Sequence, residues 1–257
     1  MKKYTADMTQ ADFQQQLHEW LQQSPGQILL EQEQQCLEQM FSELFGHHLV
    51  QLGGGGFDFD LSGVSRFRSH LVLDASVPTQ PLVSHVRADP LELPILSAAV
   101  DAVLMPHTLD FSADPHRILR EVERILIPEG RVVILGFNPL SLWGVWRLFK
   151  RSSTAIPWQG HFLGQRRVND WLSLLGFDLE ITRQLMFRPP LRGRGLMERL
   201  ERIERIGQRF WPRLSSVYLV QAVKRVSTMT IVGPIWKQKS SLLGGQIIEP
   251  TTRQSNE

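Results

Sequence analysis

The alternation of apolar and polar residues is clearest between residues 88 and 138. Residues 100–105 form an apolar run, interrupted only by Asp101, which is typical of a strand buried on both faces of a parallel sheet. Asp114 and Pro115 then supply an N-cap acceptor and a fixed φ, which indicates the start of a helix. The apolar stripe of this helix consists of Ile118, Leu119, Val122, Ile125 and Leu126. A turn at 128–130 and a buried strand over 131–136 complete a strand–helix–strand unit, so we expect a right-handed parallel crossover.

Five further segments are predicted as strands, and two helices precede the first of them. These strands are 48–52, 71–74, 82–87, 177–185 and 216–224. The second helix is marked by Leu29, Glu33, Cys36, Leu37, Met40, Phe41 and Leu44, with Gly46 placed to cap its end. Seven strands with helices between several of the first five predict an α/β fold with a doubly wound, mostly parallel sheet. We expect the last two strands to add antiparallel pairing at one edge.

Composition divides the chain into three parts. Residues 1–46 are predicted as an N-terminal helical extension, residues 47–227 as the α/β domain, and residues 228–257 as a disordered tail that is polar and broken by glycine and proline.

The net charge of +2 is unevenly distributed along the chain. Residues 1–130 contain 8 Lys and Arg against 18 Asp and Glu, and residues 131–257 contain 20 against 8. Such asymmetry is compatible with a charged partner at one end of the domain.

Several short motifs in the middle of the chain occur together at characteristic spacings. They are Asp89 followed by Leu93-Pro94, Asp101-Ala-Val-Leu, His107-Thr-Leu-Asp110, Leu119-Arg-Glu121, Arg124-Ile-Leu and Pro128-Glu-Gly130. The chain thereby resembles class I S-adenosylmethionine-dependent methyltransferases, and more narrowly the type 11 methyltransferase domain. With Gly136-Phe-Asn-Pro139 and Trp143-Gly144, residues 46–226 are similar to the YafS-like proteins of proteobacteria. The resemblance implies a Rossmann-like sheet and S-adenosyl-L-methionine as the cofactor.

A run of four glycines follows the first predicted strand. Glycines at this turn let the backbone approach a ligand without an intervening Cβ, and the resemblance implies cofactor contacts at Gln51, Gly53 and Gly55. Gln51 stands where the family has an acidic residue, and Phe57 stands where it has its last glycine. Four glycines also suit a plain flexible turn, but the motifs that follow favour a cofactor loop.

Two carboxylates follow the next strands. Asp74 ends the second strand, where a carboxylate can accept hydrogen bonds from both ribose hydroxyls, the alternative being a loop aspartate that caps Ser76. The resemblance implies that Asp89 accepts a hydrogen bond from the adenine amine and that Leu91 and His107 also contact the cofactor, whereas the alternative for Asp89 is an Asp-Pro turn. Because only 14 residues separate the two aspartates, the usual helix between them is absent or reduced to one turn.

The catalytic chemistry demands few side chains, since the cofactor is already activated and the protein mainly aligns the acceptor. His107 is the candidate general base, although a histidine after a strand more often bonds to neighbouring loops, which we favour. Asp110 is expected to cap the following loop. At Met105-Pro-His-Thr108 the chain lacks the Asn/Asp-Pro-Pro-aromatic motif of amino-methylating relatives, which argues against methylation of adenine or glutamine amides.

An aromatic and basic segment follows the fifth strand, where relatives build the acceptor pocket. Candidate substrate residues there are Asn138, Trp143, Arg147 and Arg151. The basic cluster Arg147, Lys150, Arg151, Arg166 and Arg167 predicts an anionic small-molecule acceptor held at the pocket rim. Core packing, a solvated surface and contact with a lipid surface are the alternatives for these side chains.

Other classes of partner and site are not indicated. Cys36 is the only cysteine, which fits a reducing compartment, and we expect a cytoplasmic monomer without a nucleic-acid partner. The longest apolar run, 132–146, is interrupted by polar residues and proline, so no membrane insertion is expected. The histidines lack companions at metal-ligand spacing. Two rival functions stay open: a degenerate, non-catalytic binding module, and a nicotinamide-dependent oxidoreductase, since Asp74 follows the glycines by about twenty residues.

Overall fold

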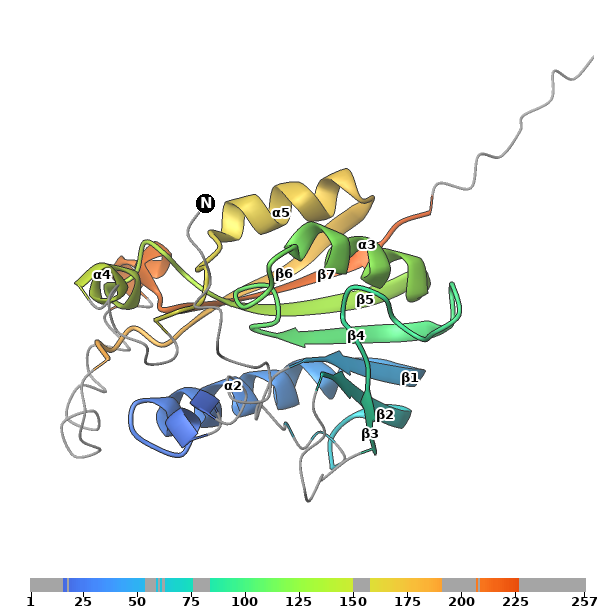
Figure 1. The fold of residues 1–257 in the computed structure, drawn as a ribbon, viewed down its shortest axis with the longest axis horizontal. Coiled ribbons are helices and arrows are strands. Elements are labelled where there is room, and N and C mark those ends of the chain that lie inside the picture. The colour runs from blue at the N-terminus through green and yellow to red at the C-terminus, as the bar shows by residue number, and fades with distance from the viewer. Residues whose placement is uncertain are drawn as a thin grey trace, which may run out of the picture. The chain divides into compact units, whose positions relative to one another are not determined.

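The computed structural model describes residues 16–17, 19–53, 59, 61, 63–75, 84–149, 158–190, 207 and 209–226. Within these residues a seven-stranded sheet has the order β3-β2-β1-β4-β5-β7-β6 (Figure 1). The strands are β1 (Phe45–Leu52), β2 (Arg66–Asp74), β3 (Ser84–Arg87), β4 (Val100–Pro106), β5 (Leu126–Phe137), β6 (Phe177–Leu185) and β7 (Val217–Lys224). The helices are α2 (Gly26–Phe41), α3 (Pro115–Ile125), α4 (Leu142–Phe149), α5 (Gln165–Leu174) and the short 3-10 helix η1 (Pro212–Leu214).

The strand directions agree with the predicted doubly wound sheet. Strands β1 to β5 pair in parallel with one another, and β7 pairs antiparallel with both β5 and β6. The chain leaves β1 for β2 and β3, then crosses back to place β4 on the other side of β1. The strand order therefore reverses between β1 and β4, and ligands of open α/β sheets bind beyond the carboxyl ends of the strands at such a point.

Two helical layers cover the sheet (Figure 1). Successive side chains of a strand point to opposite faces. Val103 and Met105 accordingly join the core formed with α3 and α5, while Ala102 and Leu104 join the core formed with α2. The helix residues of the first core are Ile118, Leu119, Val122, Ile125, Val168, Trp171 and Leu172. Those of the second are Cys36, Leu37, Met40 and Phe41.

The predicted start of α3 is confirmed, but the end of this helix differs from the prediction. The side chain of Asp114 accepts a hydrogen bond from the backbone N of Arg117 at 3.1 Å, as an N-cap does. Strand β5 begins at Leu126, directly after the helix, rather than at 131. Leu126 pairs with Val100, but Arg131 already pairs with Ala102, so residues 127–130 form an excursion within the strand. The predicted turn at 128–130 is this excursion.

The prediction that Gly46 caps the second helix is wrong. Helix α2 ends at Phe41 with Ser42 at its C-cap, and β1 begins at Phe45, so Gly46 is a strand residue. A Cβ on Gly46 would lie 2.7 Å from the side chains of both Phe67 and Asp101. This glycine is needed for close packing against its neighbours rather than for a left-handed cap.

Several predictions concern residues outside the described ranges. They include Gly55, Ser76, Lys150, Arg151 and the tail at 228–257. The division into extension, domain and tail therefore stays a prediction. Among the described residues, no helix combines the length and the apolar character needed to cross a membrane.

Candidate functional site

The ends of three neighbouring strands lie in a row at the carboxyl edge of the sheet. The backbone N of Gly53, after β1, donates to the carbonyl of Leu73 in β2 at 2.7 Å. The backbone N of Ala88, after β3, donates to the carbonyl of Asp74 at the end of β2 at 2.9 Å. These bonds bring together Gly53, Asp74 and the turn that begins at Asp89, which are three of the predicted site positions.

Gly53 adopts a backbone conformation that favours glycine. Its φ is +65°, and a Cβ there would lie 3.3 Å from the side chain of Thr108, which follows β4. The Thr108 hydroxyl donates to the carbonyl of Leu52. The segment after β4 is thus hydrogen-bonded to the end of β1. These two strands are neighbours at the point where the strand order reverses.

Gln51 is buried at the end of β1, 1% exposed. Its side-chain Nε2 lies 3.4 Å from the carbonyl oxygen of Gly53. The Gln51 side chain therefore lies against the glycine turn itself. Its predicted role at the cofactor stays a prediction.

The two aspartates differ in exposure. Asp74 is 7% exposed, and its Oδ1 accepts a hydrogen bond from the backbone N of Ala75 at 2.6 Å. Asp89 is exposed, and its Oδ1 accepts from the backbone N of Leu91 at 2.9 Å, while its carbonyl accepts from the backbone N of Glu92 at 3.0 Å. The Asp-Pro turn considered as an alternative is thus present. A carboxylate can accept several hydrogen bonds, so the turn leaves Asp89 capable of binding a donor.

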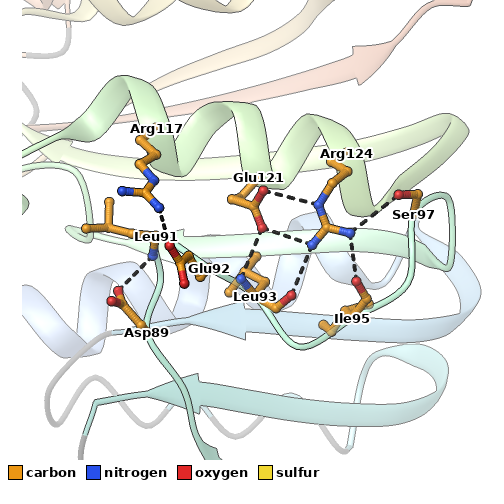
Figure 2. A network of polar contacts seen from close by, with 9 residues as sticks. All are labelled: Asp89, Leu91, Glu92, Leu93, Ile95, Ser97, Arg117, Glu121 and Arg124. Atoms are coloured by element: carbon orange, nitrogen blue, oxygen red, sulfur yellow. Dashed lines mark hydrogen bonds and ion pairs between the residues drawn. The ribbon is translucent and has the colours of Figure 1, made fainter.

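Two residues of α3, Glu121 and Arg124, hold the loop that follows this turn, and we call them the α3 clamp (Figure 2). The Arg124 guanidinium donates to the carbonyls of Leu93, at 3.0 Å, and Ile95, at 2.8 Å, while the Glu121 carboxylate accepts from the backbone N of Leu93 at 3.0 Å. Glu121 and Arg124 also pair with each other at 2.9 Å. The hydrogen bond from Arg124 keeps the pKa of Glu121 below its usual range. The sequence motif on α3 is therefore the support of the Asp89 loop.

Replacing Arg124 by methionine should loosen residues 91–97 while leaving the sheet intact. Amide hydrogen exchange at Leu93 should accelerate by roughly tenfold or more, because a charge-assisted hydrogen bond contributes roughly 1.5–3 kcal/mol. Arg117→Met is the matched control, since Arg117 is on the same helix and contacts the same loop only through the exposed side chain of Glu92. Equal exchange in both variants would show that Arg124 does not hold the loop.

A buried acid–histidine–acid group lies after β4. His107 Nε2 is 2.8 Å from Oε1 of Glu33 in α2, and His107 Nδ1 is 3.2 Å from Oδ2 of Asp110. All three side chains are at most 1% exposed, and the imidazole stacks on Phe137 with ring centroids 4.0 Å apart. Asp110 additionally accepts from the backbone N of Phe137 at 2.8 Å and of Leu163 at 3.3 Å. We call Glu33, His107 and Asp110 the buried triad.

The buried triad holds a proton at neutral pH. Burial opposes charge on His107, but the charge of Glu33 and the hydrogen bonds to Asp110 and Glu33 outweigh it and raise the pKa of His107 to about 9. Burial also raises the pKa of Glu33 and of Asp110, against the opposing effect of His107. A raised pKa on His107 favours the ion pair, whereas a raised pKa on the carboxyls favours neutral acids. We adopt the ion pair, because the pKa of His107 is about 9, and its additional proton at neutral pH is shared in the hydrogen bonds to the two acids.

The geometry does not support His107 as the general base or as a cofactor ligand. Both ring nitrogens bond to carboxyl groups inside the protein, and the pKa near 9 means that the ring already carries its proton at neutral pH. The alternative role, bonding to neighbouring segments, describes what His107 does. The Asp110 side chain likewise joins the end of β5 to the residues just before α5 rather than capping its own loop.

The candidate substrate residues that the structure describes are used for internal contacts. Asn138 Nδ2 donates to the carbonyls of Arg213 and Ser215, both at 2.9 Å. Trp143 is fully buried, and its Nε1 donates to the carbonyl of Arg188 at 2.8 Å. Arg147 lies over the Phe162 ring, 5.0 Å from its centroid, and its Nε donates to the carbonyl of Trp158 at 3.2 Å.

The side-chain nitrogen atoms of Asn138 and Trp143 are used in these internal bonds, and the substrate role of both residues stays a prediction. Arg147 is half-buried and bonded, and Arg151 lies outside the described residues. Within the predicted basic cluster, Arg166 and Arg167 are exposed on α5, where Arg167 stacks on Trp171.

Sequence reasoning missed two residues that shape the site. Glu33 occupies an apolar stripe position of α2 together with Leu29, Cys36 and Leu37, and a charged residue at such a position signals a buried partner. Thr108 belongs to the motif His107-Thr-Leu-Asp110, but no local pattern indicates its bond to Leu52 across the sheet.

Comparison with known proteins agrees with the fold and the motifs. A family model described as a methyltransferase domain matches residues 56–134. The Escherichia coli (strain K12) protein described as "Uncharacterized protein YafS" is 37% identical over 143 residues, which cover 56% of this chain and 58% of that protein. The chain thus matches little more than half the length of this relative. Both matches confirm the resemblance found in the sequence.

Solved structures share the fold at low sequence identity. An S-adenosylmethionine-dependent methyltransferase from Thermotoga maritima has a TM-score of 0.60 at 17% identity, over 83% of this chain and 98% of that chain. One from Mesorhizobium loti has a TM-score of 0.52 at 18% identity, over 74% and 96%. The [4+2]-cyclase SpnF has a TM-score of 0.52 at 14% identity, over 75% and 80%. These likenesses show the Rossmann-like fold of class I methyltransferases, which confirms the predicted fold class.

Proposed function

We propose that this protein, whose chain has the class I methyltransferase fold, is an S-adenosylmethionine-dependent methyltransferase that acts on a small molecule. The observation that carries the proposal is the row of strand ends formed by Gly53, Asp74 and the Asp89 turn. Gly53 provides backbone without a Cβ, and Asp74 and Asp89 provide carboxylates, which are the groups that the cofactor needs. All three lie at the carboxyl edge of the sheet, where ligands of open α/β sheets bind. The match of residues 56–134 to a methyltransferase domain supports the same function.

The residues present suit the parts of S-adenosylmethionine. Gly53, with its left-handed φ, offers backbone without a Cβ for the methionine part. Asp74 would accept the ribose hydroxyls, and the exposed carboxylate of Asp89 would accept the adenine amine, with Leu91 beside it partly buried against the core. When bound, this cofactor supplies a methyl group activated by a sulfonium. The chain's part is to orient cofactor and acceptor, and the proposal assigns no proton transfer to His107.

Fold alone does not decide the activity, because one structural neighbour is a cyclase. Gln51 is the observation that favours a second candidate. It lies buried where relatives carry an acidic residue, and an amide lacks the charge that would pair with the amino group of the cofactor. The second candidate is therefore a degenerate member of the fold that serves as a binding or regulatory module.

Calorimetric titration with S-adenosylhomocysteine and, separately, with NAD distinguishes these functions. We expect S-adenosylhomocysteine to bind in the micromolar range, about −8 kcal/mol at 1 μM, and NAD not to bind. Absence of binding of either ligand up to millimolar concentration would favour the non-catalytic module. Preferential binding of NAD would favour an oxidoreductase.

The nature of the acceptor stays a prediction. The anionic small molecule is inferred from the basic second half of the chain, whose Arg147 also has the internal contacts described above. Screening of metabolite extracts with a labelled cofactor tests it directly. A cytoplasmic location and a monomeric state likewise stay predictions, for which the single buried Cys36 is the supporting observation on the compartment.

A further inference from the structure

Helix α4 exposes an apolar stripe to solvent. Leu142, Val145, Trp146 and Phe149 recur at helical spacing, and all four are exposed, Phe149 to 83%. A stripe with this spacing normally faces the core of a protein. The core-facing side of α4 is formed by other residues, since Trp143 and Gly144 are buried. The helix is therefore apolar on its outer side as well as on its inner side.

A second exposed apolar segment adjoins the start of α4. Around η1, Phe210 is 66% exposed and Trp211 59% exposed, and Leu214 is also exposed. Asn138, just before α4, is bonded to the carbonyls of Arg213 and Ser215, which fixes the two segments together. In Figure 1 the orange segment that precedes β7 lies next to α4. We call their joint surface the α4 face. It consists of Leu140, Leu142, Val145, Trp146, Leu148, Phe149, Phe210, Trp211 and Leu214.

The charges at the α4 face are of one sign. Arg209 and Arg213 are exposed beside Phe210, Trp211 and Leu214. Neither 138–149 nor 207–216 contains an acidic residue. Exposed apolar side chains gathered on two neighbouring segments usually mark a surface that binds something, and the partner must also be compatible with arginines that have no acidic residue within either segment.

We propose that the α4 face docks on an anionic lipid surface. Tryptophan and phenylalanine side chains favour the boundary between headgroups and acyl chains, and arginines next to them favour anionic headgroups. The helix is about 12 Å long, so it can lie in this boundary but not cross a bilayer. The proposal goes beyond methyl transfer and does not depend on it.

Charge favours lipid over a second copy of the chain. In a two-fold contact the same patch faces itself, so Arg209 and Arg213 would be brought toward their own copies with no acidic residue from 138–149 or 207–216 to compensate them. Like charges at an interface are unfavourable. An anionic membrane satisfies both the apolar side chains and the arginines.

The α4 face also lies on the functional side of the sheet. Strand β5 ends at Phe137, and α4 begins five residues later, while β7 runs antiparallel and starts from the same edge at Val217. The carboxyl edge that holds Gly53, Asp74 and Asp89 is the edge from which α4 extends. Docking would therefore bring this edge of the protein toward the lipid.

Vesicle flotation of the full-length protein tests the proposal. We expect binding to vesicles of equal parts phosphatidylcholine and phosphatidylglycerol, weak binding to phosphatidylcholine alone, and loss of binding at high salt. The variants Trp146→Ser/Phe149→Ser and Arg209→Glu/Arg213→Glu should each reduce the partition coefficient by roughly tenfold or more.

Matched controls separate docking through the α4 face from nonspecific adsorption of the protein to vesicles. Phe45 is 79% exposed at the start of β1, so Phe45→Ser removes an exposed aromatic elsewhere, and Arg66→Glu/Arg68→Glu reverses two exposed charges on β2. Both controls should bind vesicles like the wild type. The proposal is overturned if the folded wild-type protein does not bind anionic vesicles, or if the α4-face variants bind as well as the controls. It is also overturned if light scattering shows a dimer that only the α4-face variants dissociate, since a second copy would then cover the face.

Discussion

Replacing His107 by leucine should lower the free energy of unfolding by roughly 3–5 kcal/mol at pH 7, because it leaves two buried carboxyl groups without their common partner. Glu33 and Asp110 would face each other's charge at no more than 1% exposure. Urea denaturation followed by circular dichroism measures the loss. We expect this to be the largest effect of any single substitution near the site, since α2, the end of β4 and the end of β5 all meet at the buried triad.

The control must separate charge from backbone strain. The φ of His107 is +54°, a conformation that asparagine tolerates better than leucine. His107→Asn keeps this tolerance and one side-chain donor, so it should be less destabilising than His107→Leu. An equal loss in both variants would show that the histidine ring contributes by packing on Phe137 and not by pairing with the acids.

The buried triad also makes stability depend on pH. In the unfolded chain His107 titrates near 6.5, and in the folded protein its pKa is about 9. A raised pKa contributes stability that is fully present below pH 6.5 and is lost as the pH rises through 9, which corresponds to on the order of 3 kcal/mol.

We therefore expect the free energy of unfolding to fall between pH 6.5 and 9.5. The variant Glu33→Gln/His107→Asn cannot hold the shared proton, so its stability should change much less over this range. A wild-type stability that is constant over the same range would mean that the triad does not retain the proton.

In β1 and β2 the sequence predicted the buried half of the strand but not its exposed half, whereas both ends of the partly exposed β6 were predicted. In β1 and β2 only the last residues are buried, and the prediction began at 48 and 71 whereas the strands begin at Phe45 and Arg66. Arg66, Arg68 and the two histidines of β1 are polar, because this end of the sheet faces solvent. Where strands are buried along their whole length, as in β4 and β7, prediction and structure differ by one residue at one end.

The placement of site residues that follow strands was predictable from the order of the strands. Hydrogen-bond partners that are distant in the sequence were not predictable. Asp74 and Asp89 follow strands, and parallel strands end at a common edge, so their approximate placement follows from order along the chain. The bond between Glu33 and His107 joins residues 74 apart in sequence, and no local pattern identifies such a partner. The internal partners of Trp143 and Asn138 are not predictable for the same reason, since the carbonyls that bind them lie after β6 and around η1, far along the chain.

Asp89→Ala should weaken the binding of S-adenosylhomocysteine by roughly ten- to a hundredfold while leaving the melting temperature within a few degrees. The proposed bond between the carboxylate and the adenine amine contributes roughly 1.5–3 kcal/mol. Asp89 is exposed, so its loss should not disturb the core. Asp170→Ala, which removes an exposed carboxylate from α5, is the matched control and should bind like the wild type. Unchanged affinity in Asp89→Ala, measured by calorimetry on folded protein, would mean that adenine is bound elsewhere.

Coupling between Asp89 and Arg124 makes the test more specific. Arg124 contacts the backbone of Leu93 and Ile95 and not the turn itself, so it can affect the cofactor only by holding the loop that follows Asp89. Arg124→Met alone should weaken binding severalfold, and in the Asp89→Ala background it should weaken it little further, because the group that it positions is then missing. Arg117→Met should have no effect in either background, since its ion pair with Glu92 is exposed. Additive losses from Asp89→Ala and Arg124→Met would show that the two residues act independently, and the α3 clamp would then stabilise the loop without positioning the carboxylate.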